Sequence, residues 1–370
     1  MSFFEEYGIR KFINAHDTYT VYGGSRMADN TLQAMREIAK HFVDMEQLQR
    51  KLGEKIAEMT HNEGAYITNG AAGALLLSAS VCMVRGNMYH YHQLPNTDNV
   101  KNEIIVLRAQ RNAYDEAVWT SGAKMVEIGD ADETLEFELE GAINEKTAAV
   151  FYFLSSLYSR GSMELSKVIE IAHRKGIPVV VDAAAQLPPV ENLWNITGMG
   201  ADLVIFSGGK TICGPADSGL ILGKKDLIEE CIRFGAPGHG ICRVSKTSRE
   251  NMAGLFIALK NYLEQDQEKN RRILLQRNRI IAEMADEIKC IKEIAIIPYG
   301  PVGQTYPRLF IYLKENIPGE LIVKQMYNRN IYIGYEKNRN AIYISPLNIT
   351  DEEAKIVKAN LQEILKEYTS

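Results

Sequence analysis

The sequence of 370 residues has few cysteines and lacks any apolar run that approaches the length of a membrane span. An odd number of cysteines without metal-type spacing argues against a disulfide framework and against a zinc site. Residues 1–7 begin with acidic side chains, which is not the pattern of a secretory signal. We therefore expect a cytoplasmic protein with no metal and no membrane partner. Its reduced thiols would be mostly packing residues: Cys82, Cys213, Cys231, Cys242 and Cys290.

An excess of positive charge is also absent. Lys and Arg total 42 against 47 Asp and Glu, which gives a net charge of -5. This balance offers no overall attraction to nucleic acid or to an anionic membrane. The composition, 46% hydrophobic and 24% charged, is that of a globular protein, and the length predicts two domains.

Short β-branched runs alternate with amphipathic stretches from about residue 60 to residue 225, which is the pattern of a parallel sheet covered by helices. Residues 165–175 are predicted to form one of these helices and lead into the strand that ends at Asp182. We predict seven strands, at 65–67, 103–107, 124–127, 148–153, 179–182, 203–206 and 220–222.

The last third of the sequence predicts a small α+β domain. Residues 249–288 are expected to form a long helical region with Ser248 as its N-cap, and Thr350 with Glu353 has the spacing of a capping box. Short apolar runs lie between these helices, at 295–298, 309–313, 331–333 and 341–344. The predicted parts are an N-terminal active-site segment (1–30), a large domain (31–248), and a linking helix with a small domain (249–370).

Lys210 and Asp182 carry the clearest chemical signal. Lys210 follows the predicted strand 203–206, and Asp182 ends the predicted strand 179–182. Pyridoxal 5'-phosphate (PLP) requires an amine that holds its aldehyde and a carboxylate at its ring nitrogen, because a protonated ring is a better electron sink. The two residues therefore predict a PLP site in which both are catalytic.

Gly209-Lys210-Thr211 also resembles the end of a nucleotide-binding P-loop. That motif requires a glycine at the position that Val204 occupies here, so the P-loop is excluded. The remaining alternative is an ordinary turn with a solvated lysine.

A phosphate cradle is predicted where small residues after strand 65–67 open an apolar helix, because a helix N-terminus favours an anion. Close packing between helix and strand is the alternative explanation of the same residues. Ser207, three residues before Lys210, and Gln186, four residues after Asp182, are also predicted to contact the cofactor. A serine at this position is equally typical of a turn. The candidate cofactor-binding residues are Thr68, Gly70, Ala71, Ala72, Asp182, Gln186, Ser207 and Lys210.

The ring-stacking residue is expected within residues 110–114, which follow strand 103–107. Tyr114 is a candidate, and the alternative is a half-buried core aromatic. Substrate contacts are predicted from Ser25, Arg243 and Lys246, since arginine and lysine bind carboxylate or phosphate groups. Solvated surface charge is the alternative for each cation. Further basic residues are Arg233, His239, Arg308 and Arg339.

Several motifs together resemble the bacterial selenocysteine-synthase-like branch of fold-type I PLP enzymes, and within it the D-glucosaminate-6-phosphate ammonia-lyase group. The resemblance spans nearly the whole chain. Its motifs are Asn14-Ala15, Gly23-Gly24-Ser25, residues 68–72, residues 181–189 and residues 206–210.

This resemblance implies an aspartate-aminotransferase-like α/β fold, with a mostly parallel seven-stranded sheet in the large domain and a small α+β C-terminal domain. It implies Lys210 as Schiff-base lysine and general base, Asp182 at the ring nitrogen, and a homo-oligomer, at least a dimer, with shared active sites. The sequence departs from the branch at residues 15–18, at Gln110 or Arg111, and at residues 238–246.

The implied reaction is β-elimination from an amino acid or a phosphorylated amino sugar acid, giving a 2-keto acid and ammonia. A racemase or an aminotransferase would use the same cofactor site. A transferase acting on aminoacyl-tRNA is disfavoured by the acidic composition and by motifs that begin near residue 14. Retention of both Lys210 and Asp182 argues against a scaffold protein that binds PLP without catalysis.

Overall fold

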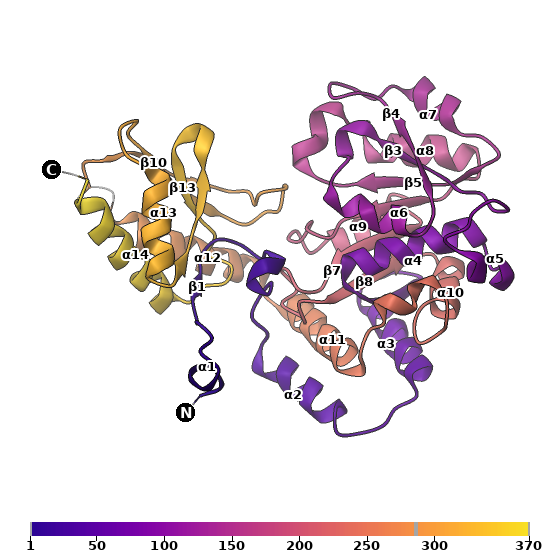
Figure 1. The fold of residues 1–370 in the computed structure, drawn as a ribbon, viewed down its shortest axis with the longest axis horizontal. Helices are drawn as coiled ribbons and strands as arrows, with labels where there is room; N and C mark the ends of the chain where they lie inside the picture. The colour runs from indigo at the N-terminus through magenta and orange to yellow at the C-terminus, as the bar shows by residue number, and fades with distance from the viewer. Residues whose placement is uncertain (1, 285–287, 369–370) are drawn as a thin grey trace. The chain divides into compact units, whose positions relative to one another are not determined.

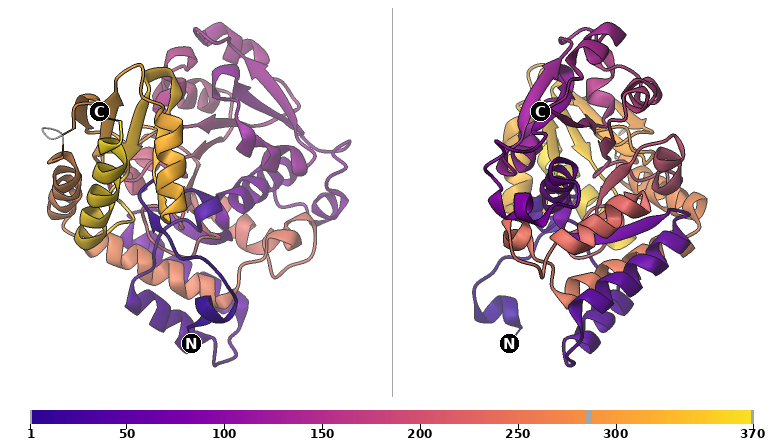
Figure 2. Two further views of the ribbon diagram at one scale, coloured as in Figure 1. Left: turned by 60° about the vertical axis from the view of Figure 1, so that its left-hand side comes forward. Right: turned by 90° about the vertical axis from the view of Figure 1, so that its right-hand side faces the viewer.

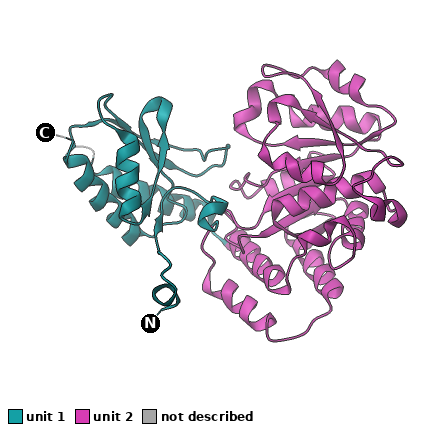
Figure 3. Cartoon of the chain, in the orientation of Figure 1, with its two compact units in different colours: residues 1–24, 265–370 teal, residues 25–264 magenta. Residues whose placement is uncertain are grey.

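The computed structural model describes residues 2–284 and 288–368. The chain forms two compact units, one of residues 25–264 and the other of residues 1–24 with 265–370 (Figure 3). The division between them differs from the predicted boundary at residue 248, because helix α11 (Arg249–Glu264) packs within the larger unit. Residues 1–24 belong to the unit formed by the C-terminal part of the chain.

The larger unit is built on a seven-stranded sheet, and all seven predicted strands are confirmed (Figure 1). The strand order is β2-β8-β7-β6-β5-β3-β4. Strands β3 to β7 run parallel, and β8 runs antiparallel to both of its neighbours. The strands are β2 (Gly64–Asn69), β3 (Glu103–Leu107), β4 (Lys124–Ile128), β5 (Thr147–Phe153), β6 (Val179–Asp182), β7 (Leu203–Ser207) and β8 (Ser218–Gly223).

Both faces of this sheet are covered by helices, which explains why its central strands are mostly apolar, whereas the edge strand β4 contains Lys124 and Glu127. In β3, Ile105 and Leu107 join one core while Ile104 and Val106 join the other. One core contains side chains of α3 (Met45–Met59), α8 (Leu165–Arg174), α9 (Asn192–Gly198) and α11. The other contains side chains of α4 (Gly70–Val84), α5 (Met88–Gln93), α6 (Glu116–Thr120) and α10 (Lys225–Phe234).

The smaller unit contains a four-stranded antiparallel sheet, in the order β12-β13-β10-β9. Helices α13 (Gly319–Asn328) and α14 (Asp351–Lys366) pack against each other, as both Figure 1 and the left view of Figure 2 show. The capping box of Thr350 and Glu353 at the start of α14 is confirmed. The strands are β9 (Ile291–Ile297), β10 (Arg308–Leu313), β12 (Gly334–Glu336) and β13 (Ala341–Ile344).

One prediction for this part of the chain was wrong. The predicted helical region 249–288 is two helices, because the Asp266 side chain accepts a hydrogen bond from the Lys269 N–H and caps α12 (Gln267–Ala282). Residues 285–287 of that region lie outside the described residues. The apolar run 331–333 lies outside the four-stranded sheet, since β11 (Ile331–Tyr332) pairs in parallel with β1 (Ile13–Asn14).

Within residues 2–284 and 288–368, no helix is both long enough and apolar enough to cross a membrane.

Candidate active site

Strand register brings the two predicted catalytic residues to the same edge of the sheet. Asp182, the last residue of β6, pairs with Ile205 of β7, and β7 ends at Ser207. Lys210 lies in the turn that follows. The carboxyl ends of parallel strands are where open α/β sheets bind ligands. Asp182 and Lys210 therefore lie at the same edge of the sheet, at the ends of neighbouring strands.

The turn that holds Lys210 depends on two close backbone approaches. The Gly208 N–H donates to the Ser218 carbonyl at 2.8 Å. A Cβ atom at Gly208 would lie 2.1 Å from Ser218 Oγ, and one at Gly209 would lie 2.6 Å from the Ala216 Cα. Real Cβ atoms do not come so close to their neighbours. The two glycines before Lys210 are thus required by packing.

Ser25 contacts the same turn from a distant part of the sequence. Its hydroxyl lies 3.0 Å from the Gly209 carbonyl oxygen and 2.8 Å from the Lys210 carbonyl oxygen. A serine hydroxyl has one hydrogen to donate, and here these two carbonyls compete for it. The role that the structure shows for Ser25 is to fix the backbone of Lys210, and its predicted contact with substrate remains a prediction.

The environment of Asp182 is unfavourable to its charge. Burial raises the pKa of the Asp182 carboxyl, while a hydrogen bond from the Ala184 N–H at 2.9 Å and the charge of Lys210 act to lower that pKa. The net direction is upward, so the folded protein favours the neutral acid more than water does. A carboxylate in this position would be stabilised by a cationic partner.

The first turn of α4 lies close to Ser207. Gly219 of β8 pairs with Thr68 of β2 on one side and with Ser207 of β7 on the other. Two strand spacings separate Thr68 from Ser207, which is about 10 Å. Gly70 begins α4 with a φ of +64°, and the Thr68 hydroxyl donates to its carbonyl at 2.9 Å. The predicted cradle residues and Ser207 therefore border one region.

Ala71 is half-buried and Ala72 is exposed at the start of α4, so the helix N-terminus is accessible. The first N–H groups of a helix lie outside its own hydrogen-bond ladder and favour an anion. Lys246 lies beside this turn, because its carbonyl accepts a hydrogen bond from the Asn69 amide at 3.3 Å. Arg243 belongs to the adjoining short helix η5 (Ile241–Ser245), and both cations are exposed.

The predicted glutamine, Gln186, is almost completely buried. Its amide donates to the Leu154 carbonyl at 2.8 Å. Gln110 contacts Phe153, the residue before Leu154. Its Oε1 accepts a hydrogen bond from the Phe153 N–H at 2.9 Å. The two glutamines hold the chain where it leaves β5, beside Asp182. These contacts give Gln186 a structural role in addition to any role toward a cofactor.

Within the stretch 110–114, two of the residues are held by other contacts, and Tyr114 stays the candidate for ring stacking. Gln110 is 1% exposed and bonded to β5, and Arg111 is paired with Asp115 and Glu127. Tyr114 is 64% exposed, so the alternative that made it a half-buried core aromatic is wrong.

Tyr158 is a site residue that the sequence analysis missed. It lies in the short helix η4 (Ser156–Gly161) that follows β5, the strand beside Asp182. Burial raises the pKa of Tyr158 first, and the negative charge of Asp182 raises that pKa further. The sequence signal for Tyr158 was an aromatic residue shortly after the predicted strand 148–153, which neighbours the strand of Asp182.

Two other basic residues have contacts of their own. Arg233 donates to the Gly86 carbonyl at 3.0 Å, and the guanidinium of Arg308 lies over the rings of Phe310 and Tyr343 in the smaller unit. The five cysteines are free thiols. Among the described residues, no group of three or more His, Cys, Asp or Glu side chains is arranged to hold a metal ion.

The architecture is that of the fold-type I PLP enzymes, a large α/β unit with a seven-stranded sheet and a smaller unit with an antiparallel sheet. The profile of the L-seryl-tRNA selenium transferase family matches residues 18–294. Because this match covers most of the sequence, the chain belongs to that family.

Known relatives extend over the full length of the chain. D-glucosaminate-6-phosphate ammonia lyase of Salmonella typhimurium is 30% identical over 98% of this chain and 97% of its own length. A 5'-C-glycyluridine monooxygenase-decarboxylase of Streptomyces is 30% identical over 77% of this chain and 71% of that protein. A solved structure of D-glucosaminate-6-phosphate ammonia-lyase has a TM-score of 0.86 and 27% identity, with both chains covered completely.

The close contacts of Gly208 lead to a prediction about stability. Gly208→Ala would force the new methyl group against Ser218 Oγ, so we expect the free energy of unfolding to fall by about 1–3 kcal/mol. Gly141→Ala is the matched control, because a Cβ there meets nothing within 4 Å and the residue lies in helix α7 (Glu136–Ala142). This control should gain about 0.5–1 kcal/mol. Equal changes in urea unfolding would contradict the packing argument.

Proposed function

We propose that this protein is a PLP-dependent lyase that acts on an amino acid or a phosphorylated amino sugar acid. It would remove the Cα proton and eliminate a β-hydroxyl group, and hydrolysis of the product would give a 2-keto acid and ammonia. The observation that carries the proposal is the placement of Asp182 and Lys210 at one sheet edge, with the first turn of α4 nearby. The full-length similarity to an ammonia lyase supports the choice of reaction.

The residues at this edge fit PLP chemically. Burial raises the pKa of the Asp182 carboxyl despite the charge of Lys210, and a protonated pyridine nitrogen beside it would further favour the ionised carboxylate. The first turn of α4, Thr68 and Ser207 would hold the phosphate, because backbone N–H groups and hydroxyls bind phosphate oxygens. When bound, PLP supplies an electron sink that makes the substrate Cα–H acidic.

The remaining chemistry falls to side chains of this chain. The Lys210 Nζ would hold the cofactor aldehyde and, when displaced by the substrate amine, would take the Cα proton as a general base. Arg243 and Lys246 would bind the carboxylate or phosphate of the substrate, since both are exposed beside the α4 turn. Ser25 would keep the Lys210 backbone in place and face the substrate from the same side.

We further propose a homo-oligomer, at least a dimer, with active sites completed by the neighbouring subunit. Phe42, which is fully exposed, and Val244, which is 83% exposed next to Arg243, are apolar side chains that a neighbouring subunit would cover. Light scattering after size exclusion tests this proposal. A monomer at micromolar concentration would reject it.

Other reactions that use the same residues are the competing proposals for the function. The family profile bears the name of a transferase that acts on an aminoacylated tRNA, so transfer to a tRNA-bound substrate is the second candidate. Racemisation and amino transfer use the same residues. Products separate these reactions, since the proposed lyase alone releases ammonia together with a 2-keto acid.

The first prediction of the proposed function concerns cofactor attachment. The purified protein loaded with PLP should show an absorbance band at the violet end of the visible spectrum. Reduction with borohydride should fix the cofactor covalently to Lys210. Lys210→Ala should lose this covalent label, whereas Lys225→Ala, which removes an exposed lysine, should retain it. A protein that takes up no PLP, or a label that survives in Lys210→Ala, would reject the proposed role.

The second prediction concerns the reaction. Amino sugar acids, with and without phosphate, and simple β-hydroxy amino acids should be assayed for keto acid and ammonia. Arg243→Ala should raise KM for a phosphorylated substrate by about tenfold or more, since a charged hydrogen bond contributes about 1.5–3 kcal/mol. Arg174→Ala, an exposed arginine on α8, is the control. Racemisation without ammonia release would exclude the lyase.

The third prediction concerns the cost of the buried carboxyl group. The raised pKa of Asp182 means that its ionisation disfavours the folded, PLP-free protein. This cost is absent below the unfolded pKa, develops as the pH rises toward the folded pKa, and is complete above it. Asp182→Asn should therefore raise the unfolding free energy of the PLP-free protein at pH 7 and raise it less near pH 4. PLP retention should fall in the same variant.

Denaturant unfolding of the unchanged protein and of Asp182→Asn, each without PLP at pH 7 and near pH 4, checks this expectation. The exposed Asp226→Asn is the control, and it should change stability little at either pH. A loss of stability at pH 7 in Asp182→Asn would contradict this prediction, because it would mean that the ionised Asp182 stabilises the folded protein.

A further inference from the structure

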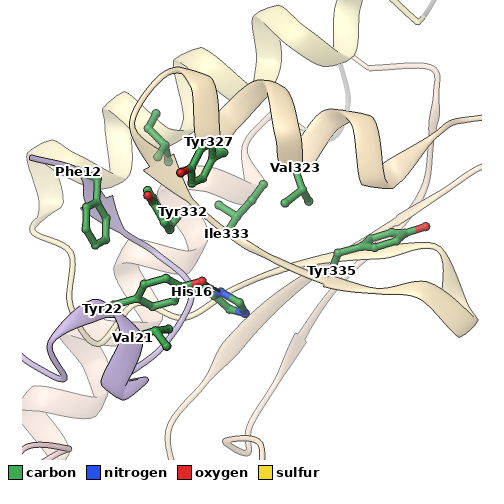
Figure 4. Close-up of a pocket in the computed structure, with 10 residues that line it drawn as sticks. Phe12, His16, Val21, Tyr22, Val323, Tyr327, Tyr332, Ile333 and Tyr335 are labelled. Carbon is green, nitrogen blue, oxygen red and sulfur yellow. Dashed lines mark hydrogen bonds between the residues drawn. The ribbon is translucent and has the colours of Figure 1, made fainter. Parts of the chain in front are cut away.

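The smaller unit contains a pocket of about 570 Å³ that the proposed function does not use (Figure 4). We call it the aromatic pocket, because Phe12, Tyr22, Tyr327 and Tyr332 line it together with His16. Its volume lies within the range of small-molecule sites. The pocket is formed entirely by residues of the smaller unit, from the N-terminal segment and from residues 323–335.

The walls suit a flat ring. The rings of Phe12 and Tyr332 have centroids 4.0 Å apart, and Tyr22 meets Tyr332 edge to face at 5.1 Å. Aliphatic side chains, among them Val323 and Ile333, complete the lining. Aromatic walls favour ligands that stack or meet them edge to face.

The lining carries no formal charge. All of its residues are described, and they include no Asp, Glu, Lys or Arg. Burial lowers the pKa of His16, and the charge of Asp17 opposes this effect only in part, so the imidazole is neutral at pH 7. The Arg10 guanidinium lies 5.3 Å from the centroid of the Tyr327 ring, but Arg10 is not among the lining residues, so an ion in the pocket would lose its hydration without a charged side chain in the lining. The lining therefore favours an uncharged ligand.

A hydrogen-bond chain through His16 leaves a donor in the pocket. The Nε2 atom lies 2.7 Å from the Tyr343 hydroxyl, and the Nδ1 atom lies 3.0 Å from the Tyr22 hydroxyl. A neutral imidazole has one N–H, and O–H donors make shorter bonds than N–H donors. We take the tautomer in which Tyr343 donates to Nε2 and Nδ1–H donates to Tyr22, since the contact to Tyr343 is the shorter of the two. The Tyr22 hydrogen is then available to a ligand.

The wall that contains His16 is fixed before any ligand binds. Strand β1 pairs with β11, and the Ser345 N–H donates to the Ala15 carbonyl at 2.9 Å. The buried Tyr306 hydroxyl donates to Asp17 at 3.0 Å. A preformed wall reduces the entropy that binding must lose.

We propose that the aromatic pocket binds a small, uncharged, planar ring that carries a hydrogen-bond acceptor, with the Tyr22 hydroxyl as donor to that acceptor. A carboxamide-substituted aromatic ring is the simplest member of this class. The ring lies against Phe12 and Tyr332, and the carbonyl oxygen meets Tyr22.

The test uses two fluorinated probes and the full-length protein loaded with PLP. 4-Fluorobenzamide has a ring and an acceptor, whereas fluorobenzene has the ring alone, and fluorine NMR titration reports binding of either. We expect 4-fluorobenzamide to bind with a Kd near 1 mM, as suits a ligand of this size. Tyr22→Phe should weaken it about five- to tenfold and leave fluorobenzene unchanged.

The control is Tyr299→Phe, the same chemical change at a tyrosine of the smaller unit that is 56% exposed and does not line the pocket. A second variant, Val323→Phe, reduces the pocket volume and should weaken both probes. Equal effects of Tyr22→Phe and Tyr299→Phe, or no binding of either probe up to about 10 mM, would overturn the proposal. Lys210→Ala should bind both probes normally, so this test is independent of the proposed catalysis.

Discussion

The parallel register between β6 and β7 is the constraint on which the candidate site depends. Asp182 pairs with Ile205. The turn that holds Lys210 begins at Gly208, three residues after Ile205. A shift by one residue would exchange the two faces of a strand, and each face is buried in a different core. The packing of both faces therefore fixes the distance along the sheet edge from the carboxyl group to the lysine.

The site also shows a conflict between stability and function. A buried carboxyl group near a lysine is a poor choice for a stable core, even with a hydrogen bond from the Ala184 N–H, because burial raises its pKa. The same carboxyl group is useful when a cationic ring nitrogen comes to it. Functional sites are where such unfavourable groups accumulate, because their chemistry needs a pKa that water would not give.

The two units offer chemically different environments. The larger unit presents a carboxyl group, a lysine, a helix N-terminus and exposed cations, all suited to charged groups. The aromatic pocket of the smaller unit presents rings, phenols and a neutral imidazole, which suit an uncharged ligand. Each environment follows from residues that are close in the fold but far apart in the sequence.

Local patterns were sufficient to predict the seven strands, because alternation, length and turn residues are properties of short segments. They failed at Asp266, where one side-chain cap divides a continuous helical pattern. The tertiary structure alone showed that Ser25 holds Lys210, that Gln110 holds β5, and that Tyr158 lies near Asp182. Such contacts join distant segments, and only packing of the whole sheet decides which segments meet.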